Sequence, residues 1–121
     1  MRRASKKGKL KRELDRLVQQ IYIKRNPHCL VCRAPTDEMH HYVQKKQSLN
    51  LRWEEINLIP LCKGCHCRHH RSGDPRVVQT IILVKGHEWA DEIERKRRII
   101  FKDNICNLEE VKERLLNEKD I

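Results

Sequence analysis

The sequence has few aromatic residues, little glycine or proline, and no long apolar run. Of its 121 residues, 4% are aromatic and 38% hydrophobic, whereas 36% are charged. No stretch approaches the roughly 20 apolar residues that a membrane-spanning helix needs, so we expect no contact with a membrane. The basic start MRRASKKGKLKR is followed by no apolar segment. It therefore predicts neither a signal peptide nor an anchor, and we expect a cytoplasmic protein.

The low hydrophobic content indicates that apolar burial alone gives a marginal core. A chain of this length fits a single domain over residues 1–121, for which a bound metal would be a useful staple. Composition divides it into a basic arm and helix at 1–26, a turn-rich segment rich in metal ligands at 27–73, and a helical part at 74–121. The predicted fold class is α+β, mainly helical.

The formal net charge of +10 is concentrated at the N-terminus. Residues 1–25 hold ten lysines or arginines against Glu13 and Asp15, a balance of +8 (10 − 2), whereas from residue 76 onward ten bases face ten acids. Such a basic segment is typical of contacts with nucleic-acid phosphates, although a solubilising tail has the same composition. The candidate DNA-binding residues of the arm are Arg2, Arg3, Lys6, Lys7, Lys9, Lys11, Arg12 and Arg16.

Apolar periodicity and capping residues predict five helices and two short strands. Helices are expected at 9–25, 63–72, 75–84, 87–100 and 108–118, and strands at 38–43 and 58–61. Asn26-Pro27 should end the first helix, and Gly73 the second. Asp74 should cap the third, and Asn107, with Glu110 three residues on, the last.

Two CxxC pairs, Cys29 with Cys32 and Cys62 with Cys65, predict a structural zinc site. Each pair turns two sulfurs toward a common point, and four thiolates complete a tetrahedral Zn²⁺ site with no open position. A pair of redox-active motifs is the alternative, but neither CxxC lies in a thioredoxin-like strand-helix pattern. We interpret Cys67 and Cys106 as packing residues, with Cys67 as a minor candidate for alternate ligation.

The histidines predict a second metal site. His66 and His70 lie four apart on the predicted second helix, so both rings can grip one cation, and His69 is the alternative to His70. Alternation along a strand sends His40 and His41 to opposite faces. Only one of these two can readily join the ion, and the other is left beside it as a candidate general base for phosphodiester cleavage.

The motifs CLVC, MHHYV, EEINLIPLC and CKGCHCRHH together resemble an HNH endonuclease over residues 28–73. The resemblance implies a ββα-metal core with an added four-cysteine zinc. It also implies that His40 ligates the catalytic ion with His66 and His70, that His41 is the general base, and that Asn57 orients this base by bracing the intervening loop. The catalytic ion is expected to be Mg²⁺, Mn²⁺, Ni²⁺ or Zn²⁺.

A wider stretch, LNLRWEEINLIPLCKGCHCRHHRSGD, with the basic helix before it, resembles the NinG (Rap) recombination family of lambdoid phages. That resemblance implies action on branched DNA recombination intermediates in a bacterial or phage-infected cell. Cuts paired across a junction would fit a homodimer, although no dimer stripe is evident. The alternative is a non-catalytic zinc-containing DNA-binding module.

Four residues near this segment also receive interpretations. We interpret Arg52, Arg68 and Arg71 as phosphate clamps close to the scissile bond, with simple solvation as the alternative. Trp53 could stack on a base, but core filling is the commoner fate for a tryptophan in a short apolar patch.

Overall fold

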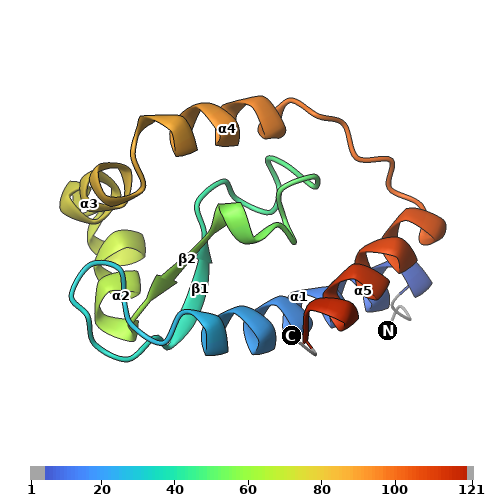
Figure 1. The fold of residues 1–121 in the computed structure, drawn as a ribbon, viewed down its shortest axis with the longest axis horizontal. Helices are drawn as coiled ribbons and strands as arrows, with labels where there is room; N and C mark the ends of the chain where they lie inside the picture. The colour runs from blue at the N-terminus through green and yellow to red at the C-terminus, as the bar shows by residue number, and fades with distance from the viewer. Residues whose placement is uncertain (1–4, 120–121) are drawn as a thin grey trace.

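The computed structural model describes residues 5–119, with the side chain of residue 72 left out, and is mainly helical with one small antiparallel sheet (Figure 1). This agrees with the predicted α+β class. The elements in chain order are α1 (Lys6–Arg25), β1 (Glu38–His41), the 3-10 turn η1 (Glu55–Asn57), β2 (Leu58–Leu61), α2 (Lys63–Ser72), α3 (Pro75–Lys85), α4 (His87–Arg97) and α5 (Ile105–Lys119).

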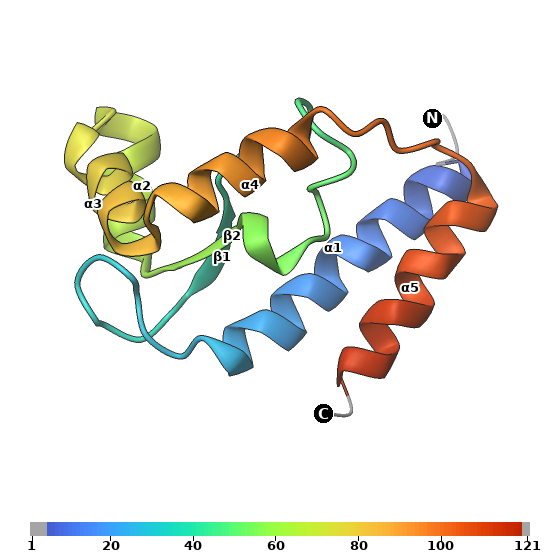
Figure 2. The same cartoon turned by 45° about the horizontal axis from the view of Figure 1, so that its top comes forward.

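Helix α1 is the longest element and packs along α5. It begins three residues before the predicted start, because the Ser5 hydroxyl accepts a hydrogen bond from the Gly8 amide at 3.0 Å and caps it. It ends at Arg25, before Asn26-Pro27, as predicted. Figures 1 and 2 both show α1 and α5 side by side. The apolar face of α1 supplies much of the core through Leu10, Leu14, Leu17, Val18, Ile21 and Tyr22.

The hairpin of β1 and β2 leads directly into α2. Its antiparallel register pairs His40 with Ile59 and His41 with Leu58, and every residue of β2 is buried. Strand β1 ends two residues before the predicted limit at residue 43. The Val43 amide donates to the Asn57 side chain at 2.7 Å, so a side chain replaces the sheet partner at that point.

The boundaries around α2 and α3 are confirmed. Gly73 closes α2 with φ of 58°, a left-handed conformation that glycine adopts at little cost. The Asp74 side chain accepts a hydrogen bond from the Arg76 amide at 3.0 Å and caps α3, whose first residue is Pro75. Gly86 ends α3, and α4 begins at the next residue.

The C-terminal part differs from the prediction in two ways. Helix α4 ends at Arg97, three residues before residue 100, and α5 begins at Ile105 instead of residue 108. The prediction that Asn107 caps the last helix was wrong. The Asn104 side chain accepts from the Asn107 amide at 2.8 Å, so the acceptor at this helix start lies three residues earlier.

Buried side chains join the helices to the hairpin. Trp53 is 2% exposed and packs in the same core cluster as α1 and α5, so its prediction as a core residue is confirmed. Cys67 and Cys106 are both exposed, and their prediction as packing residues was wrong. Both lie on the outer faces of their helices, which a cysteine count does not reveal. Within residues 5–119, no helix is long and apolar enough to cross a bilayer.

Candidate metal centres

The four cysteines of the two CxxC pairs form one cluster. Cys29 and Cys32 lie in the loop after α1, Cys62 lies directly after β2, and Cys65 lies in the first turn of α2. Their sulfurs are 3.5–3.9 Å apart. Tetrahedral coordination with Zn–S bonds of ~2.3 Å would separate the sulfurs by about 3.8 Å. The cluster therefore fits a zinc ion, and neither Cys67 nor Cys106 belongs to it.

A tight turn of the backbone forms the first cysteine pair. The Arg33 amide donates to the Cys29 carbonyl at 3.0 Å, and the Leu30 amide donates to the Pro60 carbonyl at 2.9 Å, which attaches the turn to β2. Arg33 takes a φ of 69°, the one left-handed non-glycine residue in the described chain. The backbone of this turn is thus strained, and the turn directs the sulfurs of Cys29 and Cys32 toward those of Cys62 and Cys65.

The sulfurs need a cation to share the cluster as thiolates. Burial raises the pKa of Cys65 to about 12, and the neighbouring sulfurs add to this, although the Arg68 guanidinium opposes it by donating to the Cys65 sulfur at 3.0 Å. A bound divalent cation would remove the penalty on the charged form, because a coordinating thiol is deprotonated outright. The donor set thus fits a sealed metal with no position for substrate.

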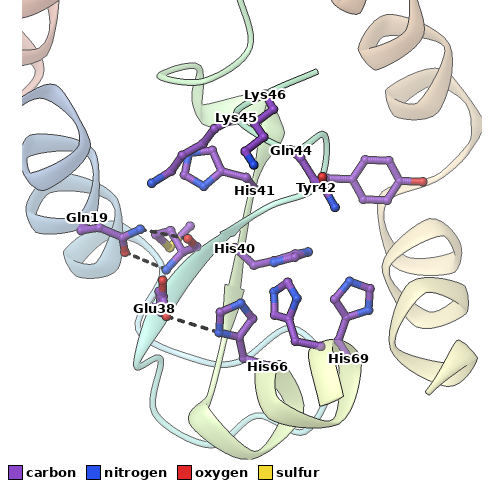
Figure 3. A pocket seen from close by; sticks show the side chains of 12 residues that line it. Gln19, Glu38, His40, His41, Tyr42, Gln44, Lys45, Lys46, His66 and His69 are labelled. Carbon is purple, nitrogen blue, oxygen red and sulfur yellow. Dashed lines mark hydrogen bonds and ion pairs between the residues drawn. The ribbon is translucent and has the colours of Figure 1, made fainter. Parts of the chain in front are cut away.

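Histidines from β1 and α2 form a second cluster. One ring nitrogen each from His40, His66 and His70 lies within 4.8 Å of the others. The ring centroid of His66 is 4.5 Å from that of His70 and 5.2 Å from that of His40. In Figure 3, His40 points from the strand toward the rings of α2. His69 is also near, 4.9 Å from His40 between ring centroids, but lies outside this three-ligand group.

Two imidazoles of the cluster, those of His40 and His66, have lowered pKa values. Burial, and then the neighbouring His69, His66 and His70, lower the pKa of His40 to about 3. Burial also lowers the pKa of His66, against the opposing charge of Glu38. Glu38 Oε2 lies 3.3 Å from His66 Nδ1, so a proton on Nδ1 leaves the Nε2 lone pair free. Three ring nitrogens that converge on one point suit a divalent cation.

His41 lies next to this cluster with a different partner. Its Nε2 is 2.9 Å from the carbonyl oxygen of Arg52. A carbonyl can only accept, so Nε2 carries the proton and Nδ1 keeps a lone pair. Burial lowers the pKa of His41, which keeps the ring neutral at pH 7. His40 and His41 both line one pocket, and of the two only His40 belongs to the three-ligand group.

Asn57 is fully buried and braces the segment between the strands. Its Oδ1 accepts from the Val43 amide at 2.7 Å, while its Nδ2 donates to the carbonyls of Val43 at 3.0 Å and Leu51 at 3.3 Å. These bonds hold both ends of the loop that carries Arg52. Asn57 makes no hydrogen bond with His41 within residues 5–119, so any influence on that ring passes through the loop.

The structure sorts the candidate DNA-binding residues into two groups, and Arg2 and Arg3 lie outside the described residues. Four are engaged internally: Arg52 with Asp15 at 2.7 Å, Arg68 with Cys65, Lys11 with Asp103 at 2.8 Å, and Lys7 with the Asp103 carbonyl. The group without a carboxylate partner in the described chain consists of Lys6, Lys9, Arg12, Arg16 and Arg71.

Sequence reasoning missed the residues other than histidine that line the histidine pocket, and four of them are polar or charged side chains of interest. Gln19 of α1, Glu38 of β1, and Lys45 and Lys46 of the following loop lie at its wall (Figure 3). Gln19 is fixed there by two hydrogen bonds with the backbone of Met39, at 2.9 and 3.0 Å. The dipeptide KK four residues after HH was a signal, because cations beside a candidate base suit a phosphate substrate.

The chain was compared with family models, with curated proteins and with solved structures, and none of the three comparisons gave a match.

Proposed function

We propose that the protein is a metal-dependent DNA endonuclease of the HNH type, with a ββα-metal core stapled by a structural zinc. The observation that supports this most is that two consecutive histidines, His40 and His41, have different partners. His40 joins the imidazole cluster, while His41 lines the same pocket and keeps the lone pair of its Nδ1, because Nε2 donates to the Arg52 carbonyl. The hairpin β1–β2 that leads into α2 has the element order of such a core.

His41 is the proposed general base. Its Nδ1 takes a proton from the water that attacks the phosphorus, and the Arg52 carbonyl stabilises the imidazolium through the Nε2–H bond. Since its pKa lies below the ordinary range, the ring is unprotonated and ready at neutral pH. Asn57 is the proposed positioning residue, because it fixes the loop that presents this carbonyl.

His40, His66 and His70 would hold the catalytic divalent ion, which is Mg²⁺, Mn²⁺, Ni²⁺ or Zn²⁺ in this proposal. The ion would polarise the phosphate and stabilise its developing charge. Lys46, an exposed side chain at the pocket wall, would contact a phosphate oxygen. Cys29, Cys32, Cys62 and Cys65 would hold the separate structural zinc.

The DNA backbone would follow the exposed side of α1 toward the pocket. Lys9, Arg12 and Arg16 are exposed, lie three and four residues apart, and therefore share one face of the helix. Gln19, three residues beyond Arg16, lines the pocket itself. A row of cations that have no carboxylate partner among residues 5–119 and that ends beside the pocket suits a bound phosphate backbone. Binding by counterion release should weaken steeply with salt.

The proposed substrate is branched DNA, such as a recombination intermediate, as the resemblance to the NinG (Rap) family implies. Paired cuts would then need two copies of the chain. Cleavage of a synthetic four-way junction should exceed that of a fork, a duplex or a single strand of the same sequence.

Nicking of supercoiled plasmid tests the activity. The zinc-loaded protein should convert plasmid to nicked circles with at least one of Mg²⁺, Mn²⁺, Ni²⁺ or Zn²⁺, and a chelator should stop the reaction. His41→Ala should lower the rate by about 100-fold or more, because a general base contributes that much. His87→Ala, which removes an exposed histidine at the start of α4, is the matched control and should cleave normally.

Zinc content and circular dichroism of both variants should match the wild type. DNA binding without nicking under any of the four ions would instead support a non-catalytic zinc-containing binding module. Full turnover by His41→Ala would remove this residue from the mechanism.

A further inference from the structure

Asp15 is an acid in the most basic part of the chain, and its carboxylate is bound by side chains of the same protein. Its carboxylate accepts from Arg52 Nε at 3.0 Å, from Arg52 Nη2 at 2.7 Å and from Trp53 Nε1 at 2.9 Å. Lys45 adds a charge at 3.5 Å. Three residues of the loop between the strands thus converge on one side chain of α1.

The carboxylate is held as an anion. Burial would raise the pKa of Asp15, but hydrogen bonds from Arg52 and Trp53 and the charges of Arg52 and Lys45 outweigh it, and the pKa falls below its usual value. The two bonds from Arg52 form the fork-like pair that fixes a guanidinium in orientation as well as position. Trp53 is 2% exposed and cannot move away without disturbing the core.

The residue gripped in this way is also the hydrogen-bond partner of His41. The carbonyl of Arg52 receives the Nε2–H of His41 at 2.9 Å. The guanidinium and the carbonyl both belong to Arg52. Fixing the guanidinium on Asp15 therefore restricts the rotation of the peptide group between Arg52 and Trp53, which contains this carbonyl. A path of direct contacts therefore runs from α1 through Arg52 to the ring of His41.

We propose that Asp15 is a positioning residue for His41 and acts through the peptide of Arg52. The carboxylate fixes the Arg52 carbonyl, which fixes the imidazole with its proton on Nε2 and its lone pair on Nδ1. Arg52 is then a brace and not a phosphate clamp. The effect of the Asp15–Arg52 contact on catalysis rests on the proposed function, whereas its effect on the position and proton of the His41 ring does not.

The ring itself gives the first readout. Nitrogen-15 chemical shifts of the full-length, zinc-loaded protein distinguish an imidazole with its proton on Nε2 from one with its proton on Nδ1. The wild type should show His41 as the Nε2–H form alone, and Asp15→Asn should show a mixture of both forms. Glu13→Gln is the matched control: it removes the same charge from α1, two residues before Asp15, and within the described part of the chain the ion pair it breaks is that with Lys112.

Kinetics on plasmid or junction DNA give the second readout. Asp15→Asn should lower kcat by about 10- to 100-fold relative to Glu13→Gln, the size of effect expected when a catalytic group is misplaced by roughly 1 Å. KM should be equal in the two variants, because their net charge is the same. Asp15→Glu, which keeps the carboxylate, should recover the Nε2–H form and most of the rate.

The proposal is overturned if His41 stays purely in the Nε2–H form in Asp15→Asn, or if Asp15→Glu behaves like Asp15→Asn. Should Asp15→Asn fail to fold, Arg52→Lys applies the same spectra to a variant that keeps the carboxylate but cannot form the two-bond pair. A wild type without nuclease activity would contradict the proposed function alone, since the ring spectra still test the brace.

Discussion

The cysteine cluster and the histidine cluster share helix α2 but differ in their ligands. Cys65 lies in its first turn and is 1% exposed, whereas His70 lies near its end and is exposed. The cysteine cluster takes its other ligands from the loop before β1, with Cys29 and Cys32, and from Cys62 directly after β2, whereas the histidine cluster takes His40 from β1 itself. Each cluster also has both buried and exposed members, so the clusters differ in ligand number: four thiols fill a tetrahedral site, whereas three imidazoles leave one position open.

The clusters also differ in what happens without a cation. Burial raises the pKa of Cys65 to about 12, whereas, against the effect of burial, backbone hydrogen bonds hold the pKa of Cys29 at about 7. Without a metal the four sulfurs therefore cannot all be thiolates, and the coordination bonds that would join the two loops are absent. His40, with its pKa lowered to about 3, is neutral with or without an ion. Loss of the metal should therefore unfold the protein at the first cluster, whereas at the second it should leave the fold intact and stop only the proposed cleavage.

Removal of a cysteine ligand should have the largest effect. Cys62→Ser takes one thiolate from the closed cluster, and zinc binding in small domains of this kind contributes on the order of 10 kcal/mol of folding free energy. We expect loss of bound zinc, measured by elemental analysis, and loss of most of the helical circular dichroism signal. Cys67→Ser, at an exposed cysteine of the same helix, is the control and should retain both.

A fully folded, zinc-free Cys62→Ser protein would contradict the proposed difference between the cysteine cluster and the histidine cluster. It would mean that apolar packing of α1 and α5 holds the fold alone, and the cysteine cluster would then be a binding site like the histidine cluster.

Removal of a histidine ligand should change metal affinity without changing the fold. His70→Ala takes one of three ligands from the open cluster, whereas His69→Ala removes a neighbour that lies outside the group. We expect His70→Ala to weaken binding of Mn²⁺ or Zn²⁺ at the second site by at least 100-fold, since even partners of ligands are worth about 10- to 100-fold. His69→Ala should bind nearly as the wild type does.

Isothermal titration of protein preloaded with one zinc measures both affinities, and circular dichroism reports the fold. Equal losses in the two variants would give His69 a place in the ligand set. Unfolding of His70→Ala would show that the second cluster is structural as well.

Local patterns predicted most element types and both ligand groups. The CxxC spacing and the i,i+4 pair His66 and His70 fix side-chain geometry within a few residues, and the structure brings these side chains together as expected. The cap at Asp74 and the left-handed Gly73 were equally local, and both are confirmed. Helix ends set by competing asparagines were less certain, because Asn104 and Asn107 are both good acceptors.

Contacts between distant segments could not be predicted. Arg52 has the composition of a phosphate clamp, and only the folded chain reveals that Asp15, 37 residues earlier, occupies its guanidinium. Lys11 is similarly occupied by Asp103. A basic residue near a candidate site is free for DNA only if no acid reaches it, and sequence spacing does not report which acids do.

The smallest expected effect concerns the backbone of the closed cluster. Arg33 sits at φ of 69° in the turn of the first cysteine pair, where the Cβ of any residue other than glycine adds strain. Arg33→Gly should remove a strain of about 1–2 kcal/mol, against a cost of about 0.5–1 kcal/mol for the greater freedom of glycine in the unfolded chain. The net gain is roughly 0.5–1 kcal/mol, or about 2–4 °C in Tm for a chain of this length at fixed zinc concentration.

Arg33→Ala keeps a Cβ and should gain nothing, so equal melting temperatures for the glycine and alanine variants would contradict the argument. Plasmid nicking should be unchanged in both, because the turn supports the sealed cluster and lies apart from the histidine pocket.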